Sequence, residues 1–241
     1  MQAMCGRFAQ PRSSEELARI FGASAAAALP GQQFNVAPTD AVAAVVERRG
    51  ERTVDAFRWG LVPAWSDAPR GGARLINARA ETVETTPAYR TAFQRRRCII
   101  PADAFYEWRR EWTPGRTRPT RSLPFAIRRT DGDPLAFAGL WAIWGDPAGE
   151  RLYSCTIITT AANELLDGLH DRMPVILDPA DWDAWLAESA RVTDLRSLLR
   201  PAPAEGLEAY PVSPAVNNVR SEGPELLLPL TRWTDGVAVD A

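Results

Sequence analysis

The stretch RCIIPADAFYEW, residues 97–108, is rich in β-branched and aromatic residues and is interrupted by a proline, which is typical of strands rather than helices. Further runs of this kind are spread along the chain, at residues 41–48, 55–62, 123–129, 134–144, 151–160, 173–177 and 208–212. They are short and are separated by proline and glycine, so we expect many short strands joined by turns.

Helix signals are fewer. Residues 13–22, SSEELARIFG, carry Ser13 and Glu16 at the spacing of a capping box and Gly22 as a stop signal. Short helices are also predicted at 86–93, 159–169 and 178–188. Because the strands do not alternate regularly with helices, we predict an α+β fold: a single domain over residues 1–241, with a largely antiparallel, barrel-like sheet and several short helices.

The composition excludes several classes of protein. No apolar run approaches the roughly 18 residues of a membrane helix, and the N-terminus lacks a signal-peptide pattern, so we expect a cytoplasmic protein that does not associate with membranes. The three widely spaced cysteines argue against a disulfide framework. With one histidine and no C-x-x-C pattern, we expect neither a metal site nor a cofactor.

The basic residues are unusual because all 28 are arginine and none is lysine. The N-terminus is therefore the only primary amine in the chain, and a Schiff base cannot come from a lysine. Residues 90–129 hold 11 arginines against three acidic residues, whereas the whole chain has a net charge of −2. This basic segment fits an anionic partner guided to one face, and it equally fits a solvated loop.

Three residues could carry chemistry, and each also has a structural explanation. Cys5 follows Met4 near the start; as the first residue it would place a thiol beside a free α-amine, and otherwise it packs as a small apolar residue. His170 suits proton transfer near pH 7, although a lone histidine is more often structural. Glu107 lies in an aromatic strand, where it would have a raised pKa if buried and an ordinary one if it faced solvent.

Two further segments suggest nucleic-acid contacts. INARAET, residues 76–82, places Asn77 and Arg79 on one side of an extended chain, where an amide and a guanidinium could orient a substrate and bind a phosphate, or form a turn and a surface charge. Trp59 and Trp65, in RWGLVPAWS, could stack on single-stranded bases, although core packing is the commoner role of tryptophan.

The combination and order of these segments resemble the SOS response-associated peptidase (SRAP) family. The resemblance extends from Met4 to about residue 220 and rests on the segments MCGRF, FNVAPT, RWGLVPAW, INARAE, RCIIPADAFYEW, FAGLW, TTAAN and HDRMPVIL. It implies a single α+β domain that binds single-stranded DNA and reacts covalently with abasic sites. In that family the initiator methionine is lost, and the exposed cysteine forms a thiazolidine with the ring-opened sugar, which shields the lesion from strand cleavage.

By this resemblance, Cys5 matches the crosslinking residue and Asn77 the active-site asparagine, which would hold the sugar or the Cys5 amine. Glu107 would exchange protons with the amine and assist removal of the methionine, and His170 would help to open the sugar ring. The residues expected to contact DNA, through phosphates or by packing on bases, are Arg7, Arg79, Arg172, Trp59, Trp65, Trp108 and Pro38.

The sequence departs from the family pattern because Met1, Gln2 and Ala3 precede the Met-Cys pair. We expect residues 1–3 to be an extraneous leader, either because translation begins at Met4 or because the chain is cut between Met4 and Cys5, and residues 221–241 to be a tail segment. We expect a monomer.

Three other functions remain open. They are an N-terminal-cysteine amidohydrolase, a non-covalent single-strand binding module, and a protease that pairs Cys98 or Cys155 with His170.

Overall fold

The computed structural model describes residues 5–111, 121–146, 148–230, 233–234 and 237–238. Its largest sheet contains a closed barrel of β4 (Ala41–Arg48), β5 (Glu51–Trp59), β7 (Arg97–Ala102), β10 (Leu135–Gly145) and β11 (Arg151–Ala161). Neighbouring strands in the barrel are antiparallel except for the closing pair, in which β11 runs parallel to β5 and Cys155 lies beside Trp59.

The C-terminal half of β11 carries two short strands on its opposite edges. β6 (Asn77–Arg79) pairs with it in parallel, and β12 (Arg172–Pro174) pairs with it in antiparallel fashion. β2 (Ser24–Ala25) pairs with β5. β11 therefore brings together two segments that are far apart in the chain: β6, which carries Asn77, and the segment that leads into β12 at Arg172.

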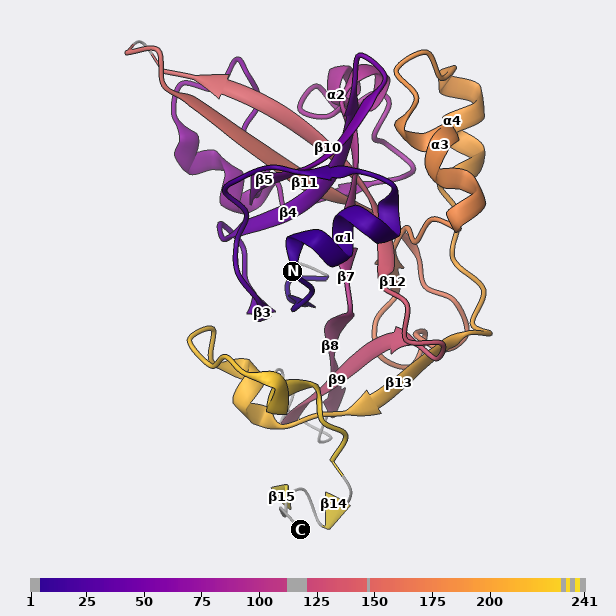
Figure 1. Cartoon of the computed structure of the whole chain (residues 1–241). Helices are drawn as coiled ribbons and strands as arrows, with labels where there is room; N and C mark the ends of the chain where they lie inside the picture. The colour runs from indigo at the N-terminus through magenta and orange to yellow at the C-terminus, as the bar shows by residue number, and fades with distance from the viewer. Residues whose placement is uncertain (1–4, 112–120, 147, 231–232, 235–236, 239–241) are drawn as a thin grey trace.

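A second, fully antiparallel sheet lies beside the barrel, below it in Figure 1. Its strands, in spatial order, are β13 (Leu207–Pro211), β9 (Arg121–Arg129), β8 (Ala104–Glu111), β1 (Phe8–Gln10) and β3 (Gln33–Val36). The stretch 97–108 is thus two strands, one in each sheet. The break falls at Asp103, whose amide donates to the Ala9 carbonyl and whose carboxylate accepts from Arg12 at 2.7 Å.

The helices are short, as predicted. α1 (Ser14–Phe21) has the expected capping box and ends at Gly22 in the left-handed conformation. The others are α2 (Arg90–Arg95), α3 (Trp182–Leu186), α4 (Val192–Leu198) and the 3-10 segments η1 (Pro69–Arg74), η2 (Pro179–Asp181), η3 (Pro214–Asn217) and η4 (Pro224–Leu227). The antiparallel pair of β14 (Trp233–Thr234) and β15 (Val237–Ala238) completes the described elements.

The helix predicted at 159–169 is wrong. Thr159, Thr160 and Ala161 continue β11 and pair with β12, and the residues after them form successive turns. The β-branched threonines favour a strand, and the Asn163 carboxamide accepts from the Leu166 amide, which stabilises a local turn instead of a longer helix. The segment that leads to His170 is therefore a turn.

The main hydrophobic core fills the barrel and continues onto the second sheet. Phe8 is fully buried, and its ring lies 5.0 Å from the ring of Trp59 and 6.1 Å from that of Phe137. This packing seats β1 against the barrel and fixes the position of the residues just before it. A second core lies between the barrel and the helices. Figure 1 shows these helices outside the barrel.

Together these features confirm the predicted α+β class with a largely antiparallel, barrel-containing sheet. No helix in the described part of the chain is long and apolar enough to cross a membrane.

Gly60 and Gly72 approach each other too closely for any side chain. Gly60 has a φ of +118°, and a Cβ built on it would lie 2.4 Å from the Gly72 carbonyl oxygen. We predict that Gly60→Ala lowers the free energy of unfolding by more than about 2 kcal/mol, through steric overlap and backbone strain. Gly31→Ala is the control, because a Cβ there meets nothing within 4 Å. Urea unfolding measures both, and equal effects would contradict the prediction.

Candidate active site

Cys5 and Glu107 meet because their strands are antiparallel neighbours. Phe8 of β1 lies opposite Phe105 of β8, so the residues before Phe8 run beside the residues after Phe105. The Cys5 amide nitrogen donates to Glu107 Oε1 at 2.7 Å, and Cys5 is fully buried. Its φ of +44° is a left-handed conformation that L-residues rarely adopt, so the surrounding packing holds a strained backbone at this residue.

The Glu107 carboxyl is buried, with 5% of the residue exposed. Phe105 packs in the main core, and the alternation of the strand places Glu107 on the same side of β8. Tyr106 and Trp108 pack in a separate cluster. Burial raises the pKa of Glu107 to about 7, against the opposing effects of the Cys5 amide and Arg110. The carboxyl can therefore bind or release a proton near neutral pH.

The three thiols are all buried. Burial, with a smaller contribution from Glu107, raises the pKa of the Cys5 thiol. Cys98 and Cys155 lie inside the barrel, where burial also raises the pKa of both thiols. Cys98 and Cys155 lie in the barrel interior, and neither lines the cavity that contains His170, which argues against a protease that pairs either of them with His170.

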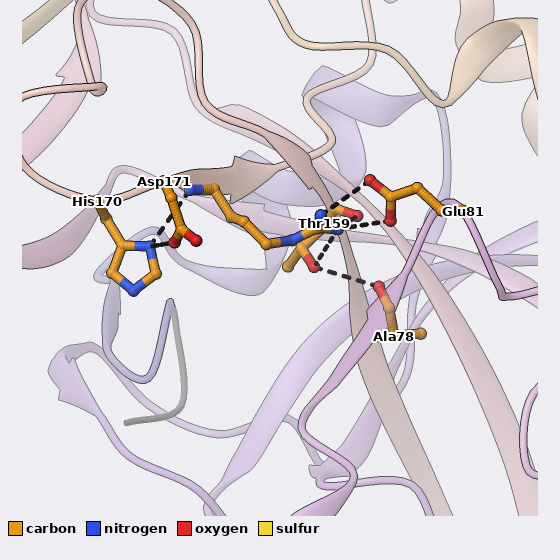
Figure 2. Close-up of polar contacts among 6 residues, drawn as sticks. Ala78, Glu81, Thr159, His170 and Asp171 are labelled. Carbon is orange, nitrogen blue, oxygen red and sulfur yellow. Dashed lines mark hydrogen bonds and ion pairs between the residues drawn. The ribbon is translucent and has the colours of Figure 1, made fainter. Parts of the chain in front are cut away.

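His170 sits in the turn before β12, with its amide donating to the Leu166 carbonyl. Its Nδ1 atom lies 2.8 Å from Asp171 Oδ1 and 3.2 Å from the Arg172 amide nitrogen (Figure 2). The first contact suits a protonated Nδ1 and the second an unprotonated one, so both tautomers have a partner. Burial lowers the pKa of His170, with Asp171 opposing, so the imidazole is neutral at pH 7 and can give or take a proton at Nε2.

An open cavity of about 410 Å³ lies over Glu107 and His170. Its lining residues come from the segment before β1, the segment after β3, β8, β9, the turn before β12 and the C-terminal segment. They are Gly6, Arg7, Pro38, Glu107, Trp108, Arg110, Ser122, His170, Asn217 and Val219. Arg7, Pro38, Glu107, Trp108 and His170 were all predicted from the sequence, and they are brought together here.

The sequence reasoning missed the residues that hold this cavity in shape. Asn35 is fully buried; its carboxamide donates to the Asn218 and Ser221 carbonyls at 2.9 and 3.0 Å and accepts from Arg7 at 2.7 Å. Asn217 accepts from the Trp108 indole at 2.6 Å. Asn35 lies within FNVAPT, but an asparagine in such a segment carries no signal for contacts across more than 180 residues.

The other predicted residues lie outside the cavity lining. Asn77 and Arg79 are on β6, and Ile76, just before them, packs in the core that contains Cys5. The Arg172 guanidinium is paired with Glu81. Trp65 is 68% exposed, on the loop after β5.

Trp59 corrects one prediction. It is fully buried, and its indole donates to the Ile76 carbonyl, so the expectation that it stacks on bases is wrong. Residues 112–120 of the basic segment lie outside the described residues, and Arg97 of that segment is buried against helix carbonyls.

The family model for SOS response associated peptidase (SRAP) matches residues 4–219. The chain belongs to this family. It is 39% identical to the abasic site processing protein YoqW of Bacillus subtilis, over 93% of this chain and 99% of that protein. It is 32% identical to the abasic site processing protein YedK of Escherichia coli, over 94% of this chain and all of that protein.

Solved structures agree with this assignment. A Bacteroides thetaiotaomicron protein superimposes with a TM-score of 0.82 at 25% identity, covering 93% of this chain and 99% of that one. A Bordetella bronchiseptica protein superimposes with a TM-score of 0.72 at 31% identity, covering 87% of this chain and all of that one. The barrel with its second sheet is therefore an SRAP fold.

Asn35 generates the first prediction for this site. Asn35→Ala leaves backbone carbonyls and the Arg7 guanidinium without their buried partner, and we expect a loss of about 2–3 kcal/mol in the free energy of unfolding. The exposed Asn218 is the control, because Asn218→Ala removes only an exposed contact to the Arg220 amide. Chemical denaturation measures both; a loss below about 1 kcal/mol for Asn35→Ala would contradict the prediction.

Glu107 generates the second. Because its folded pKa of about 7 lies above the unfolded value, folding favours the neutral carboxyl. Its contribution to stability is full below the unfolded pKa of about 4.3 and is lost as pH rises through 7. We therefore expect the unfolding free energy of the wild type minus that of Glu107→Gln to fall by about 3 kcal/mol between pH 4.5 and 7.5. Urea unfolding across this range checks it, and a constant difference would contradict the raised pKa.

Proposed function

We propose that this protein binds single-stranded DNA and captures abasic sites covalently through the α-amine and thiol of Cys5. The observation that carries the proposal is the hydrogen bond between the Cys5 nitrogen and the buried Glu107 carboxyl. A carboxyl that titrates near pH 7 thus contacts the Cys5 nitrogen. Because the chain has no lysine, this nitrogen would be the only primary amine of a chain that begins at Cys5. The related YoqW and YedK proteins are both named for abasic site processing.

The capture has two steps, which together release one water. The Cys5 amine adds to C1′ of the ring-opened sugar aldehyde, and loss of the hydroxyl as water gives an imine. The Cys5 sulfur then bonds to the imine carbon, and the thiol proton passes to the nitrogen, which closes the thiazolidine. Rapid closure protects the strand because an open imine favours β-elimination.

Glu107 and His170 supply the proton transfers. Glu107 takes a proton from the Cys5 ammonium, which frees the amine to attack, and later gives a proton to the departing hydroxyl; both transfers need a pKa near the working pH. His170 lines the same cavity; its neutral imidazole takes the proton of the C1′ hydroxyl at Nε2 and gives it to the ring oxygen as the ring opens. Asn77 orients the sugar or the amine.

The DNA strand crosses the cavity mouth. Arg7 and Arg79 contact phosphates, and Pro38 and Trp108 in the cavity wall, with the exposed Trp65, pack on sugars and bases. Phosphate contacts of this kind make binding salt-dependent.

Capture requires that the residues before Cys5 be removed, because a peptide-bonded nitrogen is not a nucleophilic amine. We propose that the mature chain begins at Cys5, by loss of Met4 from a chain initiated there or by cleavage after Met4. Self-cleavage of the peptide bond between Met4 and Cys5 would use Glu107, because its carboxyl accepts a hydrogen bond from the Cys5 nitrogen of that bond.

The test is an intact-mass measurement of the protein with a single-stranded oligonucleotide carrying one abasic site. We expect a species with the mass of the chain from Cys5 onward plus the oligonucleotide, less one water. Cys5→Ala should abolish the stable adduct, and Cys98→Ala, which removes a thiol inside the barrel, should retain it.

Persistence of the adduct in Cys5→Ala would contradict covalent capture by Cys5. Absence of an adduct from a chain already shown to begin at Cys5 would also overturn the proposal. Salt-sensitive DNA binding would then favour a non-covalent module, and ammonia release from glutamine would favour an amidohydrolase.

A further inference from the structure

Arg172 is held by a carboxylate. Its Nη1 and Nη2 atoms donate to Glu81 Oε1 and Oε2 at 2.8 and 2.9 Å, and Nη2 also donates to the Thr159 carbonyl at 2.6 Å. The Arg172 side chain is 13% exposed. Such a bidentate pair fixes both the distance and the orientation of its two groups. Figure 2 shows Glu81 and Thr159 on one side of this network and His170 and Asp171 on the other.

The Glu81–Arg172 pair crosses a strand. Arg172 begins β12, which pairs with one edge of β11, and Glu81 follows β6, which pairs with the other edge. The guanidinium therefore spans β11 at Thr159. The Thr159 hydroxyl donates to the Ala78 carbonyl of β6 at 3.3 Å, which adds a second link between β11 and β6.

Two candidate active-site residues depend on these short strands. Asn77 lies on β6 and His170 lies in the turn that enters β12, and each of these strands has only three residues. Three-residue strands are held by few ladder hydrogen bonds, so a side-chain link between them can set their relative position.

We propose that Glu81 is a positioning residue for abasic-site capture: its bidentate pair with Arg172 fixes the His170 turn relative to Asn77. This inference rests on the proposed function. Glu81 keeps its negative charge, because the hydrogen bonds from Arg172 hold its pKa below the usual range. Because the pair fixes the place of the His170 turn, we expect loss of Glu81 to change the rate of capture more than the affinity for DNA.

The chain contains a matched control. Glu84, three residues after Glu81, makes a bidentate pair with Arg196 of α4 at 2.7 and 2.6 Å. Both pairs join the segment after β6 to a later part of the chain, but Arg196 lies on α4, whereas Arg172 begins β12 directly after the His170 turn. Glu84→Gln therefore removes an equivalent ion pair without touching the candidate active site.

The experiment measures single-turnover crosslinking of the mature protein to an abasic oligonucleotide over a range of DNA concentrations. It gives a maximal rate and a half-saturating concentration for each variant. We expect Glu81→Gln to lower the maximal rate about tenfold or more, as small misplacements of catalytic groups do, with half-saturation within about twofold of the wild type. We expect Glu84→Gln to change neither quantity.

Arg172→Lys separates geometry from charge. It keeps the positive charge but loses the bidentate contact, so we expect the same loss of maximal rate as in Glu81→Gln. The double variant should be no slower than either single variant, because both substitutions remove one interaction. Thermal melting shows whether each variant is folded. If one of the two single variants folds poorly, the other still tests the pair, because either substitution removes it.

Several outcomes would overturn the inference. They are wild-type rates in Arg172→Lys, equal rates in Glu81→Gln and Glu84→Gln, additive losses in the double variant, or a change confined to half-saturation. The last would mean that Glu81 governs DNA binding through Arg172. If the wild type gives no adduct, the proposed function fails and this inference falls with it.

Discussion

The hydrogen bond from the Cys5 nitrogen to the Glu107 carboxyl is the constraint on which the site depends. It joins the start of the chain to a residue 102 positions later, and it holds a titratable group away from water. Burying a carboxyl without a partner is costly, so the contact both stabilises Glu107 and selects its position. Burial of Phe8 against Trp59 and Phe137 is what keeps β1, and hence Cys5, at this place.

β11 provides the second organising element. Its N-terminal half closes the barrel against β5, and its C-terminal half supports β6 and β12 on opposite edges. A closed barrel leaves little freedom in the register of its strands. β6, which carries Asn77, and β12, which follows the His170 turn, are thus attached to a rigid framework. Side-chain contacts such as the Glu81–Arg172 pair then refine the positions of these two strands.

Much of this could be predicted from the sequence, and the failures have physical causes. The capping box of α1 is a local signal and was confirmed. The threonine strand at 159–161 was mistaken for a helix because its pairing with β12 is a tertiary contact. Trp59 was assigned to DNA although burial decides the role of a tryptophan, and sequence does not report burial. Asn35 was missed because its partners, Arg7 and residues 216–221, lie in segments at the two ends of the chain.

The buried setting also bears on the direction of the chemistry that we propose. In a chain beginning at Cys5, the α-amine would face Glu107 as an ammonium beside a carboxylate, and a buried ion pair carries a desolvation penalty. The ammonium and the thiol together carry four protons; capture sends two of them away in the departing water, keeps one on the ring nitrogen and passes the fourth to Glu107. The adduct therefore leaves a neutral carboxyl next to a weakly basic nitrogen, which a site of low dielectric prefers over separated charges. Burial of Glu107, which is costly for the carboxylate form, would thus favour the captured state over the free amine.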